Sequence, residues 1–228
     1  MEHPRKPRTA TTLALSAVVL AALAGCGSGG VQGAGVTATD LGEAQLTEFS
    51  GTKPVPDQTE SGAYAKLDTV QQTEKLREAT TLDKPACLDA VNQWGGLKEV
   101  RSAPTSLATF STGRTTITHM LVHLPGEPAK KALDINPPKD CSAYQSTSAN
   151  GTKSTYSMRT LDLPTFGEES RAFLVETKVG KQRVKMYNLV YRHGEYLGTT
   201  TVLGPEDAEE MLREFTEAAV ERESEVLS

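Results

Sequence analysis

The sequence predicts an α+β domain in which an antiparallel β-sheet of about five or six strands carries flanking helices. Three observations lead to this prediction. Short segments rich in Thr, Val, Ile and Tyr recur between residues 106 and 203 and are separated by Gly, Pro and Asn, which is typical of strands joined by turns. A long amphipathic segment follows them. Two cysteines, Cys87 and Cys141, remain for one disulfide once the third is assigned another role.

The first 25 residues have the three-part layout of a secretory signal. A basic stretch precedes an apolar run of 12 residues, 13–24, and small residues follow it. A helix needs about 20 residues to cross a bilayer core, so this run is too short for a stable span. We therefore expect residues 1–25 to be a signal peptide that is cleaved.

Cys26 ends the sequence Leu23-Ala24-Gly25-Cys26, which resembles the cleavage box of bacterial lipoprotein precursors. The resemblance implies that the Cys26 sulfur carries diacylglycerol and that cleavage occurs before it. Two or more acyl chains, such as palmitate, give stable membrane attachment. The alternative is an ordinary signal peptide with a chance cysteine near its cleavage site. We expect a protein that is lipid-anchored on the outer face of the cell membrane.

The charge balance excludes some partners. The formal net charge of the chain is -5, and it becomes -7 when residues 1–25 are removed. Nucleic acids and anionic lipid headgroups need clustered Lys and Arg. We therefore expect no nucleic-acid partner, and we expect the lipid on Cys26 to hold the protein at the membrane.

Residues 26–62 follow the proposed cleavage site and are rich in glycine and acidic residues, with few large apolar side chains. Such a segment buries too little apolar surface to offset its ordering entropy. We expect a lipidated cysteine followed by a flexible tether, and a single domain over residues 63–228. A disordered partner-binding motif over residues 41–49 is an alternative for part of the tether.

Cys87 and Cys141 lie in a protein that we expect to reach an oxidising compartment, which favours a disulfide between them. Closing a loop of about 54 residues would destabilise the unfolded state by roughly 4 kcal/mol. Two buried free thiols are the alternative.

The first half of the expected domain mixes helices and strands. Apolar spacing and turn residues predict, in order, a helix over residues 63–79, a short helix over 85–94 capped by Asp83, strands over 106–112 and 115–124 joined by a tight turn at Gly113-Arg114, and a helical turn over 127–133. Cys141 lies in the connection that follows.

The second half reads as strands and one helix. The expected strands cover residues 154–163, 171–178, 183–192 and 196–203. The segment 183–192 has apolar side chains at both odd and even positions, so it should lie centrally and be covered on both faces. The final helix begins at Pro205, with Glu206 and Asp207 in its first turn. Its apolar face consists of Ala208, Met211, Leu212, Phe215 and Ala219.

Several short motifs resemble the extracellular sensor-like domain of certain actinobacterial serine/threonine protein kinases (PknH-like), a domain that also occurs in stand-alone lipoproteins. They are the Cys87 region, Ala103-Pro104-Thr105-Ser106, Pro138-Lys139-Asp140-Cys141, Leu163-Pro164-Thr165-Phe166-Gly167-Glu168-Glu169-Ser170, Arg192-His193-Gly194-Glu195-Tyr196 and the last helix. The resemblance covers roughly residues 85–222. It implies an antiparallel sheet with a central cleft and an extracellular ligand-binding role, without a known ligand. The chain departs from the kinases in lacking a kinase domain and a transmembrane helix, and in having one cysteine pair where two are expected.

The sequence contains no recognisable catalytic, metal or cofactor motif. His119 and His123 are four residues apart, but on a strand they would lie about 13 Å apart, too far to bind one ion. The pair Glu168-Glu169 has the residue types of a glycosidase, although a solvated loop explains it more simply. We expect no catalytic residue, no metal ion and no cofactor.

The leading hypothesis is an extracytoplasmic module that binds a small molecule, a cell-wall component or a protein partner. A lipid or glycolipid carrier and a hydrolase with a dispersed active site are the alternatives. Five aromatic residues are candidates for lining a cleft, or else belong to the core: Trp94, Tyr156, Tyr187, Tyr191 and Tyr196.

Overall fold

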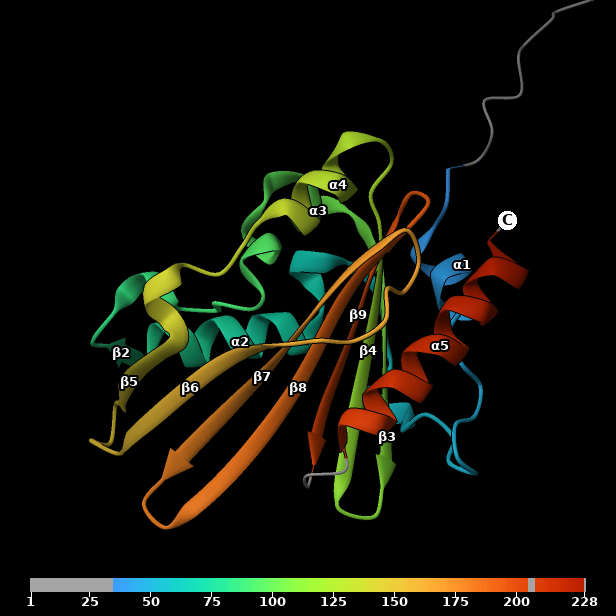
Figure 1. Cartoon of the computed structure of the whole chain (residues 1–228). Coiled ribbons are helices and arrows are strands. Elements are labelled where there is room, and N and C mark those ends of the chain that lie inside the picture. Colours follow the sequence, from blue (N-terminus) through green and yellow to red (C-terminus); the bar gives the residue numbers. More distant parts are fainter. Residues whose placement is uncertain (1–34, 205–207, 228) are drawn as a thin grey trace, which may run out of the picture. The chain divides into compact units, whose positions relative to one another are not determined.

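A computed structural model describes residues 35–204 and 208–227. These residues form a nine-stranded sheet with helices packed on both faces (Figure 1). The strands are β1 (Glu60–Ala63), β2 (Thr80–Leu82), β3 (Pro104–Thr112), β4 (Thr115–His123), β5 (Ala143–Ser148), β6 (Lys153–Leu161), β7 (Glu169–Val179), β8 (Gln182–His193) and β9 (Tyr196–Gly204). The α-helices are α1 (Ala38–Glu43), α2 (Asp68–Glu78), α3 (Lys98–Ser102), α4 (Glu127–Asp134) and α5 (Ala208–Val226). Short 3-10 turns are η1 (Pro56–Gln58), η2 (Tyr64–Lys66), η3 (Pro85–Cys87), η4 (Gln93–Gly96) and η5 (Lys139–Ser142).

The sheet is antiparallel throughout, in the order β1-β3-β4-β9-β8-β7-β6-β5-β2. This confirms the predicted α+β class and its antiparallel sheet. The expected number of strands, five or six, is too low because β1, β2 and β5 were not predicted. These strands are only three to six residues long, so they show too few alternations of apolar and polar residues to be detected.

Residues 35–62 are the largest correction, because they belong to the folded domain and not to a tether. Helix α1 begins with a capping box between Thr37 and Asp40, and β1 extends the sheet by pairing with β3. Leu41 is fully buried against Leu121 of β4, and Phe49 packs edge-on against Phe215. A few well-placed apolar residues therefore anchor a segment whose average composition is that of a linker.

The segment expected to be a helix over residues 85–94 forms the two turns η3 and η4 instead. Asp89, between them, has φ of 54°, a left-handed conformation that a right-handed helix cannot contain. Asp83, which was expected to cap this helix, contacts strand β5 instead: its carboxylate accepts a hydrogen bond from the Gln145 N–H at 2.8 Å. The segment is therefore fixed to β5 as an irregular cover.

Other elements were predicted correctly. Strands β3 and β4 form the expected hairpin, with Gly113 at positive φ in its turn. Strand β8 is the fifth of nine and is buried on both sides in its second half. Helix α5 presents Leu212 and Phe215 to the sheet. Residues 205–207, expected to start this helix, lie outside the described residues.

The two faces of the sheet carry separate cores. Helix α5 covers one face and packs on side chains such as Phe110 and Leu189. Helices α2, α3 and α4 cover the other, where Val190 and Leu107 lie. Alternation along each strand produces this division, since neighbouring residues such as Leu189 and Val190 point to opposite faces.

Candidate functional site

A pocket of about 410 Å³ opens on the face of the sheet that carries α2. Its floor is formed by strands β5 to β9, and its opposite wall by α2 and by residues 87–92, which we call the cover segment. This volume falls within the range of known sites for small molecules. Because α5 lies on the opposite face of the sheet (Figure 1), the pocket lining is separate from the core beneath α5.

The register of the neighbouring strands places the side chains that form the floor of the pocket. Val184, Met186 and Asn188 alternate along β8 and point into the pocket. The neighbouring strands add Leu203 opposite Met186 and Thr177 opposite Val184. The floor is thus mostly apolar. At its buried end the Asn188 Nδ2 donates to the Thr201 hydroxyl at 2.9 Å.

The disulfide and an ion pair hold the cover segment in place. Cys87 and Cys141 are bonded, with their Cα atoms 5.3 Å apart, as predicted. The Arg77 guanidinium of α2 lies 2.6 Å from the Asp89 carboxylate. The segment is therefore fastened at one end to η5, and thus to the start of β5, and at its middle to α2, which fixes the width of the pocket.

Two stacked tyrosines form one side wall. The rings of Tyr144 and Tyr156 lie 4.7 Å apart and nearly parallel, and the Tyr156 hydroxyl lies 3.1 Å from that of Ser146. Burial raises the pKa of Tyr144 to about 12, and the neighbouring Tyr156 adds to the effect. Tyr144 is therefore uncharged at physiological pH.

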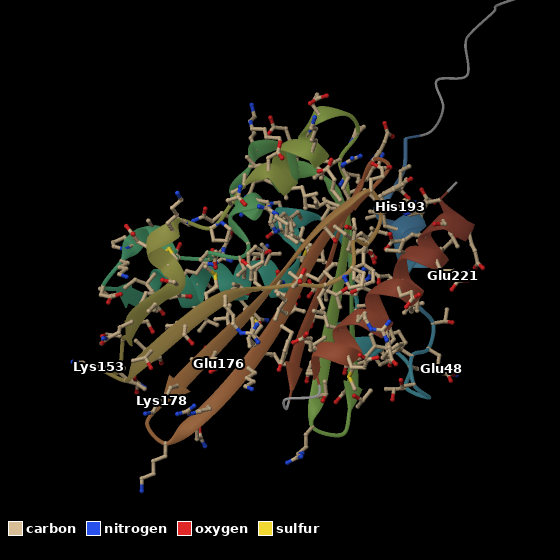
Figure 2. All side chains as sticks on the ribbon, viewed as in Figure 1. Glu48, Lys153, Glu176, Lys178, His193 and Glu221 are labelled. Carbon is tan, nitrogen blue, oxygen red and sulfur yellow. A yellow bond between two sulfur atoms is a disulfide. The ribbon has the colours of Figure 1, made fainter. Side chains whose placement is uncertain are left out.

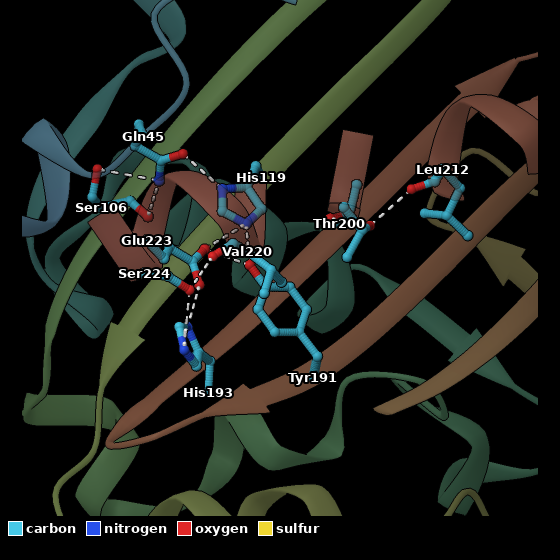
Figure 3. A network of polar contacts seen from close by, with 11 residues as sticks. Gln45, Ser106, His119, Tyr191, His193, Thr200, Leu212, Val220, Glu223 and Ser224 are labelled. Atoms are coloured by element: carbon cyan, nitrogen blue, oxygen red, sulfur yellow. Dashed lines mark hydrogen bonds and ion pairs between the residues drawn. The ribbon is translucent and has the colours of Figure 1, made fainter. Parts of the chain in front are cut away.

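A second cluster of polar groups is sealed beneath α5 and is shown in Figure 3. His119 of β4, Tyr191 of β8 and Glu223 of α5 have relative exposures of 1%, 0% and 0%. His119 Nε2 lies 2.9 Å from the Tyr191 hydroxyl, which donates to Glu223 Oε1 at 2.5 Å. On its other side His119 Nδ1 lies 2.7 Å from Gln45 Oε1. The cluster has the residue types of an acid–base site, but it is closed to a substrate.

Burial determines the protonation of this cluster. It lowers the pKa of His119 and raises that of Tyr191 well above its usual value. His193, at the edge of the cluster, has a raised pKa because it interacts with Glu223. The half-buried His193 side chain lies next to Glu223 at the edge of these buried residues (Figure 2).

The residues singled out from the sequence are distributed over several places. Of the five candidate aromatics only Tyr156 lines the pocket, whereas Trp94 is buried against Tyr64. Tyr187 and Tyr191 belong to the α5 core, and Tyr196 packs beside His123. Tyr144, Asn188 and α2 were not identified, because pocket residues far apart in sequence share no local pattern.

The other candidates have structural partners. Glu168 and Glu169 both form ion pairs with Arg192. His119 and His123 share strand β4, as expected. Within the described residues, no three His, Cys, Asp or Glu side chains gather closely enough to hold a metal ion. Cys26 and the predicted signal peptide lie outside the described residues.

None of the described helices combines the length and the apolar character needed to cross a bilayer. No family model matches the sequence, and no curated protein matches it.

The extracellular domain of a known protein has the same fold. The extracellular domain of PknH from Mycobacterium tuberculosis superimposes with a TM-score of 0.56 at 8% identity, covering 82% of this chain and 97% of that one. A Mycobacterium smegmatis protein, the Rv0999 ortholog, aligns with a TM-score of 0.42 at 14% identity, covering 64% and 76% of the two chains. The fold implied by the sequence motifs is therefore confirmed: the domain has the fold of the PknH extracellular domain.

Proposed function

We propose that the chain is a membrane-anchored extracytoplasmic lipoprotein whose domain binds a small molecule in the pocket beneath α2. The observation that carries this proposal is the pocket itself, with its apolar floor and its fastened cover segment. The fold shared with an extracellular domain supports it. The disulfide also supports it, since such bonds persist in oxidising compartments.

Binding without catalysis is favoured by the position of the acid–base groups. His119, Tyr191 and Glu223 are enclosed between α5 and the sheet, so a substrate cannot reach them. Among the described residues that line the pocket, the charged ones are Arg77 and Asp89, and these pair with each other. A general acid or base must reach the proton that it transfers, and neither group of residues meets this requirement.

The pocket hypothesis predicts a bound molecule in protein purified from its own host. Native mass spectrometry of the mature chain should detect a stoichiometric additional mass. Val184→Trp should lower the bound fraction by about tenfold or more, because the indole would fill the mouth of the pocket. Arg183→Trp is the matched control, since this neighbouring residue points to the opposite face of β8. Equal loss in both variants, or no additional mass in any protein, would contradict the proposal.

The anchor is tested separately at Cys26. Cys26→Ser should release the protein from the membrane or leave it as the longer precursor, because acyl chains attached through the cysteine sulfur provide the membrane affinity. Membrane fractionation and intact-mass analysis report both outcomes. A serine variant that stayed membrane-bound at its processed size would contradict lipid anchoring without affecting the pocket.

A further inference from the structure

The exposed apolar side chains of the domain gather at the pocket. Among the described residues, the exposed large apolar side chains are Leu76, Leu88, Val184 and Leu203, with relative exposures of 69%, 39%, 48% and 40%. All of them line the pocket, although they come from α2, the cover segment, β8 and β9. Scattered apolar residues on a surface carry no meaning, whereas a concentrated group marks a binding site. The apolar surface that they present is aliphatic.

The pocket offers no uncompensated charge to a ligand. Its charged lining residues, Arg77 and Asp89, neutralise each other across 2.6 Å. Tyr144 stays protonated because burial raises its pKa to about 12. A carboxylate, phosphate or ammonium group would lose its hydration here without gaining an opposite charge. The lining therefore selects an uncharged ligand.

Two side-chain oxygens in the lining accept no hydrogen bond from the described part of the chain. They are Oδ1 of Asn188, on the floor, and Oδ1 of Asn92, on the cover segment. Asn188 is only 3% exposed, and its Nδ2 is already used by Thr201. A buried carbonyl oxygen without a donor is costly, so such groups normally have a partner. An N–H or O–H group on a ligand would supply it.

We propose, building on the pocket function above, that the ligand is an uncharged amphiphile with an aliphatic chain and a hydrogen-bond donor. The chain lies against Leu76, Leu88, Val184 and Leu203. The donor, an amide N–H or a hydroxyl, reaches Oδ1 of Asn188. The aliphatic walls provide affinity, and the Asn188 acceptor determines which end of the ligand enters.

A matched pair of probes tests this proposal by isothermal titration calorimetry. N-octylacetamide and octyl acetate have nearly the same shape, but only the amide can donate a hydrogen bond. Titrated below their aqueous solubility limits into the chain from residue 26 onward carrying Cys26→Ser, the amide should bind about tenfold more tightly than the ester. N-hexylacetamide should bind about fifteenfold more weakly than N-octylacetamide, since each methylene contributes about fourfold.

Variants locate the interaction. Asn188→Leu should abolish the preference for the amide while leaving the affinity for octyl acetate in place. Val184→Ser, at an exposed position, should weaken both probes several-fold without a folding defect. Arg183→Ser, on the opposite face of the same strand, should change neither. Circular dichroism confirms the fold of each variant, and Val184→Ser keeps the test available if Asn188→Leu fails to fold.

Three results would overturn the proposal. Equal affinity for the amide and the ester would exclude the donor. Tighter binding of octanoate or octylammonium would exclude an uncharged ligand. Failure of all alkyl probes, while a native ligand still co-purifies and is lost in Val184→Trp, would overturn the ligand class but leave the proposed pocket function intact. If no alkyl probe binds and no native ligand co-purifies, both the proposed ligand class and the proposed pocket function are wrong.

Discussion

Replacing Phe215 with alanine is expected to lower the free energy of unfolding by about 3 to 5 kcal/mol. Phe215 is fully buried at the centre of the α5 face of the sheet. Its ring centroid lies 4.9 Å from that of Phe49 and 5.1 Å from that of Phe110, with edge-to-face geometry in both contacts. Alanine would remove both aromatic contacts and leave a cavity between α5, the sheet and the N-terminal segment. Chemical denaturation of the wild type and the variant measures the loss.

The neighbouring residue provides the control for this substitution. Glu214 is exposed on the same helix, so Glu214→Ala should change stability by no more than about 0.5 kcal/mol. Phe215→Leu, which retains much of the volume, should lie between the two. If Phe215→Ala cost as little as Glu214→Ala, the packing of α5 on the sheet as described here would be wrong.

The elements predicted correctly are those with many repeats of one period. Helix α5 has 19 residues, so the spacing of its apolar residues repeats over several turns. Strand β8 has 12 residues, enough to reveal that Val184, Met186 and Val190 form one face and Tyr187, Leu189 and Tyr191 the other. The sequence therefore indicated that both faces of β8 are covered. It did not identify what covers them.

The N-terminal segment was missed for a physical reason. Composition measures the mean apolar content of a window, whereas docking depends on single side chains in the right places. Leu41 and Phe49 pack residues 35–62 onto the domain, where the sheet and α5 provide the surface that receives them, and the pairing of β1 with β3 adds backbone hydrogen bonds. Residues 41–49, for which a disordered partner-binding motif is the alternative prediction, are ordered and pack on the sheet and α5 of the same chain.

The pocket could not be derived from the sequence, because its lining extends from Thr73 to Leu203 and no local period connects those positions. One feature of the pocket could be predicted from the sequence. This is the disulfide between Cys87 and Cys141, which follows from the number of cysteines and the expected oxidising compartment. The cover segment next to Cys87 lacks regular structure, and irregular backbone has no periodic signature. Strand pairing alone brings the floor residues together.

Replacing His119 with leucine should also lower the free energy of unfolding by about 3 to 5 kcal/mol. The imidazole links Gln45 Oε1 to Tyr191 and lies near the Glu223 carboxyl group, 3.6 Å away, in a site with almost no exposure. Leucine would leave Gln45 Oε1 and the Tyr191 hydroxyl buried without the imidazole as a hydrogen-bond partner. His123→Leu is the matched control on the same strand: its partner, Glu195, is exposed, so its loss should cost less than about 1 kcal/mol. Equal costs would refute a special role for the buried cluster.

The number of protons in the cluster explains why His119 matters more than Glu223. Gln45 donates from Nε2 to the Ser106 carbonyl oxygen, which leaves its Oε1 to accept from His119 Nδ1. Tyr191 has one proton and donates it to Glu223. Burial lowers the pKa of His119, so the neutral imidazole carries its proton on Nδ1, and its Nε2 faces the Tyr191 oxygen as a second acceptor for that one proton. His119 and Glu223 therefore compete for the Tyr191 proton.

Glu223→Leu alone should therefore cost less than His119→Leu, because Tyr191 can then donate to a neutral His119 and the chain of hydrogen bonds through Gln45 stays complete. In the His119→Leu background the same substitution should restore about 2 kcal/mol, since it removes a buried carboxyl group that has lost the imidazole 3.6 Å away and retains its contacts with Tyr191 and His193. Chemical denaturation of the four proteins gives this coupling energy directly. A double variant less stable than His119→Leu would mean that Glu223 stabilises the core by packing and not through its contact with His119.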